Sequence, residues 1–357
     1  MPLHNFDSPH GTRAEVTIDS KALRGNLVGD PTARRVAVYL PEGYASTTDD
    51  YPLFVDLVGF TGSGLAHFNW RPFGENVPQR LDRLVAEGKM GPVIAAFPDC
   101  FTSLGGNQYI NSAATGNWED FLIDEMLPRL EDEFRVRKGR EHRAVFGKSS
   151  GGFGAITHGL RRADAWGAVA SHSGDMGFAM CYSADFPKLL DELAKHDRDI
   201  AELLRHYDEK PKLDHNDLHM MMALAMAASY DPDRSGPKGI RLPVDLYTGE
   251  LIEERWANWM QHDPVELVKQ PQYQDNLRSL AGLYIDCGEK DQYALVYGAR
   301  AFRKALQEAG IAHHYEEFDD DHTGVDYRQD VSFPYLYRAV TSGAAEQLDS
   351  KPDGSGA

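Results

Sequence analysis

The sequence predicts an α/β protein built on a mostly parallel, doubly wound sheet, which one largely helical insertion interrupts. Three observations support this prediction. Short apolar runs bounded by Gly and Pro alternate with longer segments of helical periodicity, as in a doubly wound sheet. The alternation stops over residues 176–275, which contain helical pieces and loops but no convincing buried strand. A serine between glycines stands where a predicted strand runs directly into a predicted helix.

The first half of the chain supplies most of the predicted sheet. Residues 34–40 alternate in polarity and end at Pro41, which indicates a strand running into a loop. The apolar runs that follow are short, which suits strands buried on both faces of a parallel sheet. Apolar residues at intervals of three and four predict the helices. In chain order the predictions are strand 34–40, strand 53–58, helix 77–87, strand 93–97, helix 118–134, strand 142–146, helix 151–162 and strand 167–171.

The alternation resumes near the C-terminal end and defines the domain organisation. It predicts strand 281–286, helix 294–309, strand 313–318 and helix 333–346. We therefore assign residues 1–175 and 276–345 to the α/β core, 176–275 to a cap inserted over it, and 346–357 to a disordered tail. The cap contains 19 acidic and 11 basic side chains, a net charge of −8, and seven of the ten methionines.

Composition and charge exclude several classes of protein. With 37 basic and 55 acidic residues the net charge is −18, which argues against binding to nucleic acid or to an anionic membrane surface. No apolar run approaches the roughly 18 residues that a membrane helix needs. The N-terminus lacks a basic region followed by an apolar one, so we expect a cytoplasmic protein, although an exported protein in its mature form would look the same. We expect Cys100, Cys181 and Cys287 to be buried, reduced thiols.

The strongest chemical motif is Gly147-Lys148-Ser149-Ser150-Gly151, a G-x-S-x-G sequence between a predicted strand and a predicted helix. A sharp turn at this place exposes the serine hydroxyl, and the turn is too tight for side chains on the flanking positions. We therefore predict that Ser149 is a nucleophile.

A serine nucleophile needs a histidine base oriented by a carboxylate, and in this type of sheet their chain order is serine, acid, histidine. Asp291 follows the strand at 281–286 and is the first choice for the acid. Asp286, still on that strand, is the second choice, and Glu289 is the third. His322, in the loop after the strand at 313–318, is the predicted base. Both loops lie at the carboxyl ends of strands, where ligands bind in open α/β sheets.

Acyl transfer also needs two hydrogen-bond donors aimed at the developing oxyanion. One is the backbone N–H of Ser150, directly after the nucleophile. The second should come from the Gly-rich loop after the strand at 53–58, where we favour the N–H of Phe60, with Gly59 as the alternative.

Other candidates concern the substrate and metals. We predict that Gly59, Trp118, Met176, Met222 and Trp256 line the substrate pocket, although packing in the core is the alternative for each large side chain. His215 and His219 are four residues apart, but without a third obvious ligand we predict no metal and no cofactor. Asp319–Asp321 precede His322, and whether they are solvated, raise its pKa or bind a cation stays open.

These motifs resemble the putative-esterase family of the α/β-hydrolases, which includes S-formylglutathione hydrolase, feruloyl and enterochelin esterases and the mycobacterial mycolyltransferases. The resemblance rests on Val38–Pro41 with Tyr51–Leu53, Pro98-Asp99, the helix from Trp118 to Pro128, the Ser149 motif and the stretch from Asp286 to Asp291. It covers roughly 34–175 and 280–325. It implies an α/β-hydrolase fold with Ser149 as nucleophile, Asp291 as acid and His322 as base. The three aspartates before His322 and the long insertion depart from the family's pattern, so the family's substrates cannot be transferred.

The leading hypothesis is a serine esterase that cleaves a carboxylic ester or thioester through an acyl-enzyme. A peptidase, an amidase or an acyltransferase with the same triad is the alternative, because these differ only in the leaving-group pocket. A non-catalytic hydrolase-fold binding protein is a third reading. The expected partner is a small-molecule ester or acyl substrate, and the sequence leaves a homo-oligomer open.

Overall fold

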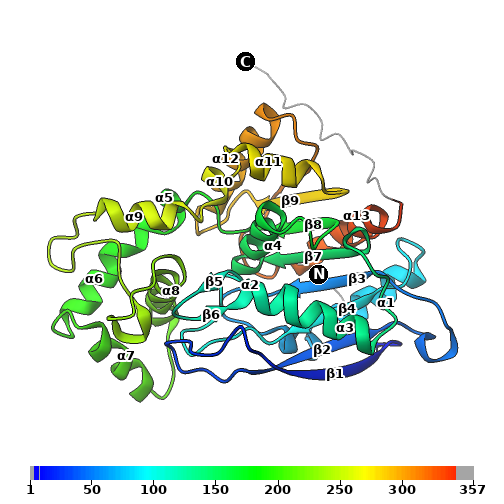
Figure 1. Ribbon diagram of the computed structural model, residues 1–357, viewed down its shortest axis with the longest axis horizontal. Coiled ribbons are helices and arrows are strands. Elements are labelled where there is room, and N and C mark those ends of the chain that lie inside the picture. The colour runs from blue at the N-terminus through cyan, green and yellow to red at the C-terminus, as the bar shows by residue number, and fades with distance from the viewer. Residues whose placement is uncertain (1–3, 8, 343–357) are drawn as a thin grey trace.

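A computed structural model describes residues 4–7 and 9–342 of the chain. Within them the main sheet has eight strands in the order β1-β2-β4-β3-β7-β8-β9-β10 (Figure 1). β1 and β4 pair with β2 in antiparallel fashion, and every other neighbouring pair is parallel, as predicted. The strand bounds are β1 Thr12–Asp19, β2 Ala33–Leu40, β3 Leu53–Leu57, β4 Ile94–Pro98, β7 Arg143–Lys148, β8 Ala168–His172, β9 Gly282–Gly288 and β10 His314–Phe318.

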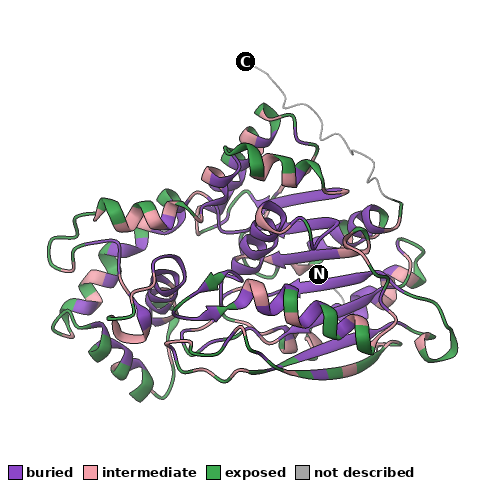
Figure 2. Cartoon of the chain, viewed as in Figure 1, coloured by how far each residue is buried: buried purple, intermediate pink, exposed green. Residues whose placement is uncertain are grey.

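Helices cover both faces of the sheet. On one face α1 (Val77–Ala86) and α13 (Gln329–Ser342) pack against strand side chains such as Phe54 and Phe146. On the other face lie α3 (Leu127–Glu133), α4 (Ser150–Arg161) and α12 (Leu295–Glu308). β3, β4, β8 and β9 are buried along their whole length, which is why they read as continuous apolar runs (Figure 2).

Two elements differ from the prediction. β1 was not expected, because it is a polar edge strand in which only Val16 is buried. The predicted helix 118–134 consists of α2 (Trp118–Asp120), a π-helical turn over Phe121–Met126, and α3. The wide turn precedes Pro128, which lacks a backbone N–H and crowds the preceding carbonyls, so a regular α-helix cannot run through it.

The chain between β8 and β9 forms helices. Their bounds are α5 Phe178–Cys181, α6 Phe186–Ala194, α7 Ile200–Glu209, α8 His215–Tyr230, α9 Glu253–Met260, α10 Pro264–Leu267 and α11 Pro271–Arg278. In Figure 1 α6 to α9 project to one side of the sheet, whereas α10 and α11 lie beside α12. In the described part of this stretch, β pairing is limited to one isolated bridge between Val244 and Leu251.

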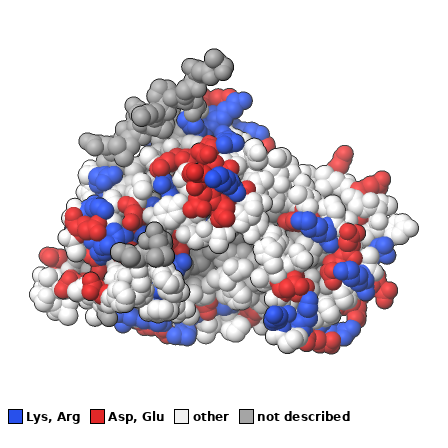
Figure 3. Space-filling model, turned by 180° about the vertical axis from the view of Figure 1, so that it is seen from behind, with Lys and Arg blue, Asp and Glu red and all other residues white. Residues whose placement is uncertain are grey.

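Helix α8 joins this helical stretch to the core. Most of its residues are buried, and Ser112 of the small β5–β6 hairpin (Asn111–Ser112 and Gly116–Asn117) donates a hydrogen bond of 2.6 Å to the carbonyl of Ala228. The projecting helices α6 to α9 carry many of the acidic residues of this stretch. Several of these residues form ion pairs, such as Glu209 with Arg205. Figure 3 shows positive and negative side chains mixed over this region.

The predicted thiols and membrane segments can be compared with the structure. All three cysteines are buried and free, as expected. Among the described helices, none is both long enough and apolar enough to span a bilayer. The C-terminal tail predicted from 346 lies outside the described residues.

Candidate active site

Ser149 sits in a strained turn between β7 and α4. Its backbone has φ 58° and ψ −125°, and its N–H donates a 3.0 Å hydrogen bond to the carbonyl of His172 on β8. The flanking glycines permit this turn: a Cβ atom on Gly151 would lie 1.8 Å from the carbonyl oxygen of Leu57, and one on Gly147 would lie 2.3 Å from it. The spacing of G-x-S-x-G therefore follows from the contact between the turn and the end of β3.

This contact predicts that Gly151→Ala will destabilise the protein. The added methyl group cannot fit beside Leu57 without moving the end of β3 or the turn, which should lower the free energy of unfolding by about 3 kcal/mol. Urea unfolding measures the change. Gly74→Ala is the matched control, since the nearest atom to its Cβ would be 3.9 Å away, and it should change the same quantity by less than about 0.5 kcal/mol. Equal stability of the two variants would contradict this description of the turn.

His322 and Asp291 form a buried pair in the loops after β10 and β9. His322 Nδ1 lies 2.7 Å from Asp291 Oδ2, and the two residues are 8% and 7% exposed. Asp291 Oδ1 accepts a 2.9 Å hydrogen bond from the backbone N–H of Tyr293. The backbone N–H of His322 donates to Gln292 Oε1 at 3.0 Å. Both side chains are therefore fixed by the two loops, and the remaining ring nitrogen of His322, Nε2, is left for other partners.

The other two acids considered for this role are elsewhere. Asp286 lies within β9, which extends beyond its predicted end, and its carboxylate is fully buried. It pairs with His172 Nδ1 at 2.7 Å and with Arg328 Nε at 2.9 Å. Glu289 is exposed. Of the three acids, only Asp291 reaches His322.

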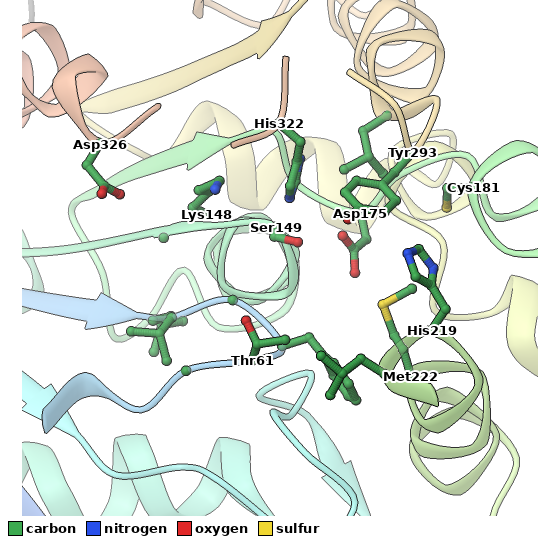
Figure 4. Close-up of a pocket in the computed structure, with 18 of the residues that line it drawn as sticks. Thr61, Lys148, Ser149, Asp175, Cys181, His219, Met222, Tyr293, His322 and Asp326 are labelled. Atoms are coloured by element: carbon green, nitrogen blue, oxygen red, sulfur yellow. The ribbon is translucent and has the colours of Figure 1, made fainter. Parts of the chain in front are cut away.

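Ser149 and His322 line one cavity of about 300 Å³. Figure 4 shows the imidazole of His322 directed toward the hydroxyl of Ser149. The loop after β3, the Ser149 turn, residues after β8, the first two turns of α8 and the loops after β9 and β10 form the walls. The cavity therefore lies at the carboxyl ends of the parallel strands, covered by α8.

The two predicted oxyanion donors lie beside Ser149. Within the described residues, neither the N–H of Phe60 nor that of Ser150 has a hydrogen-bond partner. A Cβ on Gly59 would be 3.4 Å from Ser149 Cβ, so the loop passes close to the serine. Gly106 packs against this loop, and its N–H donates a hydrogen bond of 2.6 Å to the Phe60 carbonyl oxygen. A Cβ atom added at Gly106 would lie 2.4 Å from that oxygen, so the contact requires a glycine.

The predicted substrate residues divide into two groups. Gly59 and Met222 line the cavity, but Trp118, Met176 and Trp256 do not, which corrects the prediction for these three. Trp118 is the first residue of α2, is 1% exposed, and donates a hydrogen bond of 2.9 Å from its indole N–H to the Thr115 carbonyl. Met176 is fully buried against Gly298, and Trp256 packs against other aromatic rings inside the helical insertion. Trp118 and Met176 are thus core residues, and Trp256 is partly buried against the core cluster.

Several polar residues in the cavity were not predicted. Asp175 follows β8, is 5% exposed, and has its pKa raised to about 6 by burial, against the hydrogen bond from Tyr182. Lys148 lies on the other side of Ser149 in Figure 4, and burial lowers the pKa of its ammonium group. Lys148 occupies a variable position of the G-x-S-x-G motif, and no motif marks Asp175. The rule that sites gather at the carboxyl ends of parallel strands was the one available signal, since both stand there.

The residues considered for metal binding have other contacts. His215 Nε2 and His219 Nε2 lie 3.1 Å apart, and His219 lines the cavity. Asp320 accepts a 3.0 Å hydrogen bond from the Tyr327 hydroxyl, and Asp321 accepts one of 2.6 Å from the backbone of Thr323. In the part of the chain that the structure describes, no three His, Cys, Asp or Glu side chains form a group able to hold a metal.

Comparison with known proteins gives a family match over most of the chain. The model of the family described as Putative esterase matches residues 31–332. An esterase of Mycobacterium tuberculosis is 32% identical over 146 residues, which cover 39% of this chain and 28% of that protein. An endo-1,4-beta-xylanase/feruloyl esterase of Xylanibacter ruminicola is 27% identical over 165 residues, 45% of this chain and 21% of that protein. The matches thus span about a quarter of the length of these relatives.

Solved structures show the same fold. A ferulic acid esterase superposes with a TM-score of 0.59 at 22% identity, covering 92% of this chain and 98% of the other. An S-formylglutathione hydrolase from Agrobacterium tumefaciens gives 0.56 at 14% identity, covering 94% and 98%. The fluorophosphonate-binding serine hydrolase F of Staphylococcus aureus gives 0.55 at 16% identity, covering 92% and 98%. The fold is that of the α/β-hydrolases, as predicted.

Proposed function

This chain belongs to the Putative esterase family, and from that premise we propose that it is a serine hydrolase that cleaves a carboxylic ester or thioester through an acyl-enzyme. The observation that carries the proposal is the buried 2.7 Å pair of His322 and Asp291, which shares a cavity with Ser149. A cavity of about 300 Å³ suits a small-molecule substrate.

In the proposed mechanism, the oxygen of Ser149 attacks the acyl carbon while His322 Nε2 takes the hydroxyl proton. Asp291 accepts the hydrogen bond from Nδ1–H of His322, which fixes the tautomer and stabilises the imidazolium. The N–H groups of Ser150 and Phe60 stabilise the negative charge on the former carbonyl oxygen. His322 then gives its proton to the leaving alcohol or thiol. Water, deprotonated by His322, attacks the acyl-enzyme and releases the acid and free Ser149.

Matched substrates separate this function from its alternatives. With p-nitrophenyl acetate we expect a burst of p-nitrophenolate stoichiometric with the enzyme, followed by steady turnover, because acylation and deacylation are separate steps. The matching p-nitroanilide should react far more slowly, and added small alcohols should take little of the acyl group from water.

Each alternative has its own outcome in the same assay. Faster cleavage of the anilide would favour an amidase or peptidase, and dominant transfer to the alcohol would favour an acyltransferase. Absence of turnover on every ester and thioester tested would contradict the proposed function and favour a binding protein.

A further inference from the structure

Asp175 is a buried carboxylate that the proposed mechanism does not use. It lies in the segment after β8, is 5% exposed and lines the cavity that contains Ser149. In Figure 4 its carboxylate points into the cavity between Ser149 and His219. The carboxylate that orients His322 is Asp291, so Asp175 has no part in the triad.

The hydrogen bonds of Asp175 involve only one of its two oxygens. Oδ2 accepts from the Tyr182 hydroxyl at 2.8 Å and from Ser150 Oγ at 3.4 Å. Ser150 Oγ in turn accepts from Gln108 Nε2 at 2.8 Å, so the network supplies only neutral donors. Among the described residues, Oδ1 has no hydrogen bond, and no Lys, Arg or His forms an ion pair with this carboxylate.

A buried carboxylate without a cation is unfavourable unless another donor reaches it. Here the free oxygen belongs to a residue that lines the cavity, so the donor must come from within the cavity, either from solvent or from an O–H or N–H group of a ligand that replaces it. The cavity wall includes apolar and aromatic side chains, among them Leu218 and Met222 from α8 and Tyr293 after β9. Because Asp175 is itself only 5% exposed, a hydrogen bond to its ionised carboxylate forms in a low-dielectric environment and is strong.

We propose that Asp175 is a specificity-determining residue that accepts a hydrogen bond from an O–H or N–H group of the substrate. The preferred esters then carry a hydroxyl or ammonium group on the part of the molecule that lies under α8. This inference rests on the proposed function, because it assigns a substrate class to the same cavity. It goes beyond that function by predicting which esters are selected.

The test compares matched esters on the wild type and on Asp175→Asn. The substrates are the p-nitrophenyl esters of hexanoate, ω-hydroxyhexanoate and ω-ammoniohexanoate, together with a second series that carries the same groups on the alcohol side. We expect the wild type to favour at least one donor-bearing ester over its alkyl counterpart by roughly tenfold in kcat/KM, and Asp175→Asn to remove most of that ratio. Comparison of the hydroxy esters with the ammonio esters shows which of the two donor groups Asp175 binds.

Controls separate recognition from a general structural effect. Asp263→Asn replaces another buried aspartate, which binds the backbone N–H groups of Gly177 and Phe178 and does not line the cavity, and it should keep the wild-type ratio. Asp175→Ala is the second variant if the asparagine variant does not fold. An equal loss on donor and alkyl esters, or no preference in the wild type in either series, would overturn the inference.

The pH dependence of the ratio gives an independent readout. The pKa of Asp175 is raised to about 6, so the carboxylate is ionised above that pH and protonated below it. The donor preference should therefore be present above about pH 6 and decline below it, while any pH effect common to both esters cancels in the ratio. A ratio that stays constant across this range would count against Asp175. The titratable groups that face it are Asp291, His322, Cys181, Tyr182, Tyr230 and His219.

Ester binding to an inactive variant distinguishes a failure of the Asp175 inference from a failure of the proposed function. In the Ser149→Ala background, calorimetry with ethyl ω-hydroxyhexanoate and ethyl hexanoate measures recognition without turnover. Tighter binding of the hydroxy ester that disappears on adding Asp175→Asn supports the inference even if hydrolysis assays fail. Equal binding of the two esters, with hydrolysis intact in the wild type, overturns this inference and leaves the proposed function standing.

Discussion

Ser149→Ala is expected to lower kcat/KM for p-nitrophenyl acetate by at least about 10⁴-fold, because in the proposed mechanism the Ser149 oxygen is the atom that forms the acyl-enzyme. The fold should remain intact. Alanine keeps the Cβ atom and the same backbone preferences as serine, so the strained turn at φ 58° costs no more than before. Initial rates and circular dichroism on the same preparation test both statements.

An exposed serine provides the control for this substitution. Ser103 lies outside the cavity, its hydroxyl has no hydrogen bond within the described residues, and Ser103→Ala should keep wild-type rates. If Ser149→Ala retains more than about a hundredth of the wild-type rate, the nucleophile is a different group, and the assignment of the turn is wrong.

Asp291→Asn should also reduce kcat by about 10⁴-fold, with little change in stability. The amide has nearly the shape of the carboxylate, but its NH₂ group favours the His322 tautomer with the proton on Nε2. That tautomer cannot take the proton of Ser149, and the imidazolium loses its stabilising charge. Steady-state kinetics and urea unfolding measure the two quantities separately.

Asp286→Asn is the matched comparison, since it alters a buried aspartate on β9 itself, five residues before Asp291. Its carboxylate pairs with His172 and Arg328, so its neutralisation should cost about 3 kcal/mol of unfolding free energy. The folded fraction should retain wild-type kcat, because Asp286 does not contact His322. The opposite pattern, with activity lost in Asp286→Asn and retained in Asp291→Asn, would contradict the assignment of the acid.

The sheet was predictable because its parallel strands are buried on both faces. Continuous apolar runs such as 53–58 and 93–97 have no polar alternation that could be mistaken for another element, and they match β3 and β4. β1 lacked this signal, since an edge strand needs few apolar residues and pairs mainly through its backbone. The π-helical turn before Pro128 was missed because helical periodicity does not distinguish i+4 from i+5 hydrogen bonds over one turn.

The triad candidates could be located because their chain order and loop positions follow from the topology of the sheet. The pocket wall could not be predicted in the same way. An apolar side chain such as Trp118 or Met176 has the composition of a pocket residue, but only the three-dimensional packing determines whether it faces a cavity or the core. Asp175 was missed for a related reason, because its significance comes from burial beside Ser150 rather than from any sequence pattern.

The central claim, that Ser149 is the nucleophile of a Ser149–His322–Asp291 triad, is tested most directly by covalent labelling. The enzyme is treated with a fluorophosphonate, its intact mass is measured, and the modified peptide is sequenced. We predict one adduct per chain, located on Ser149, absent in Ser149→Ala and formed much more slowly in Asp291→Asn. An adduct on another residue, or an enzyme that hydrolyses esters without being labelled, would contradict the claim.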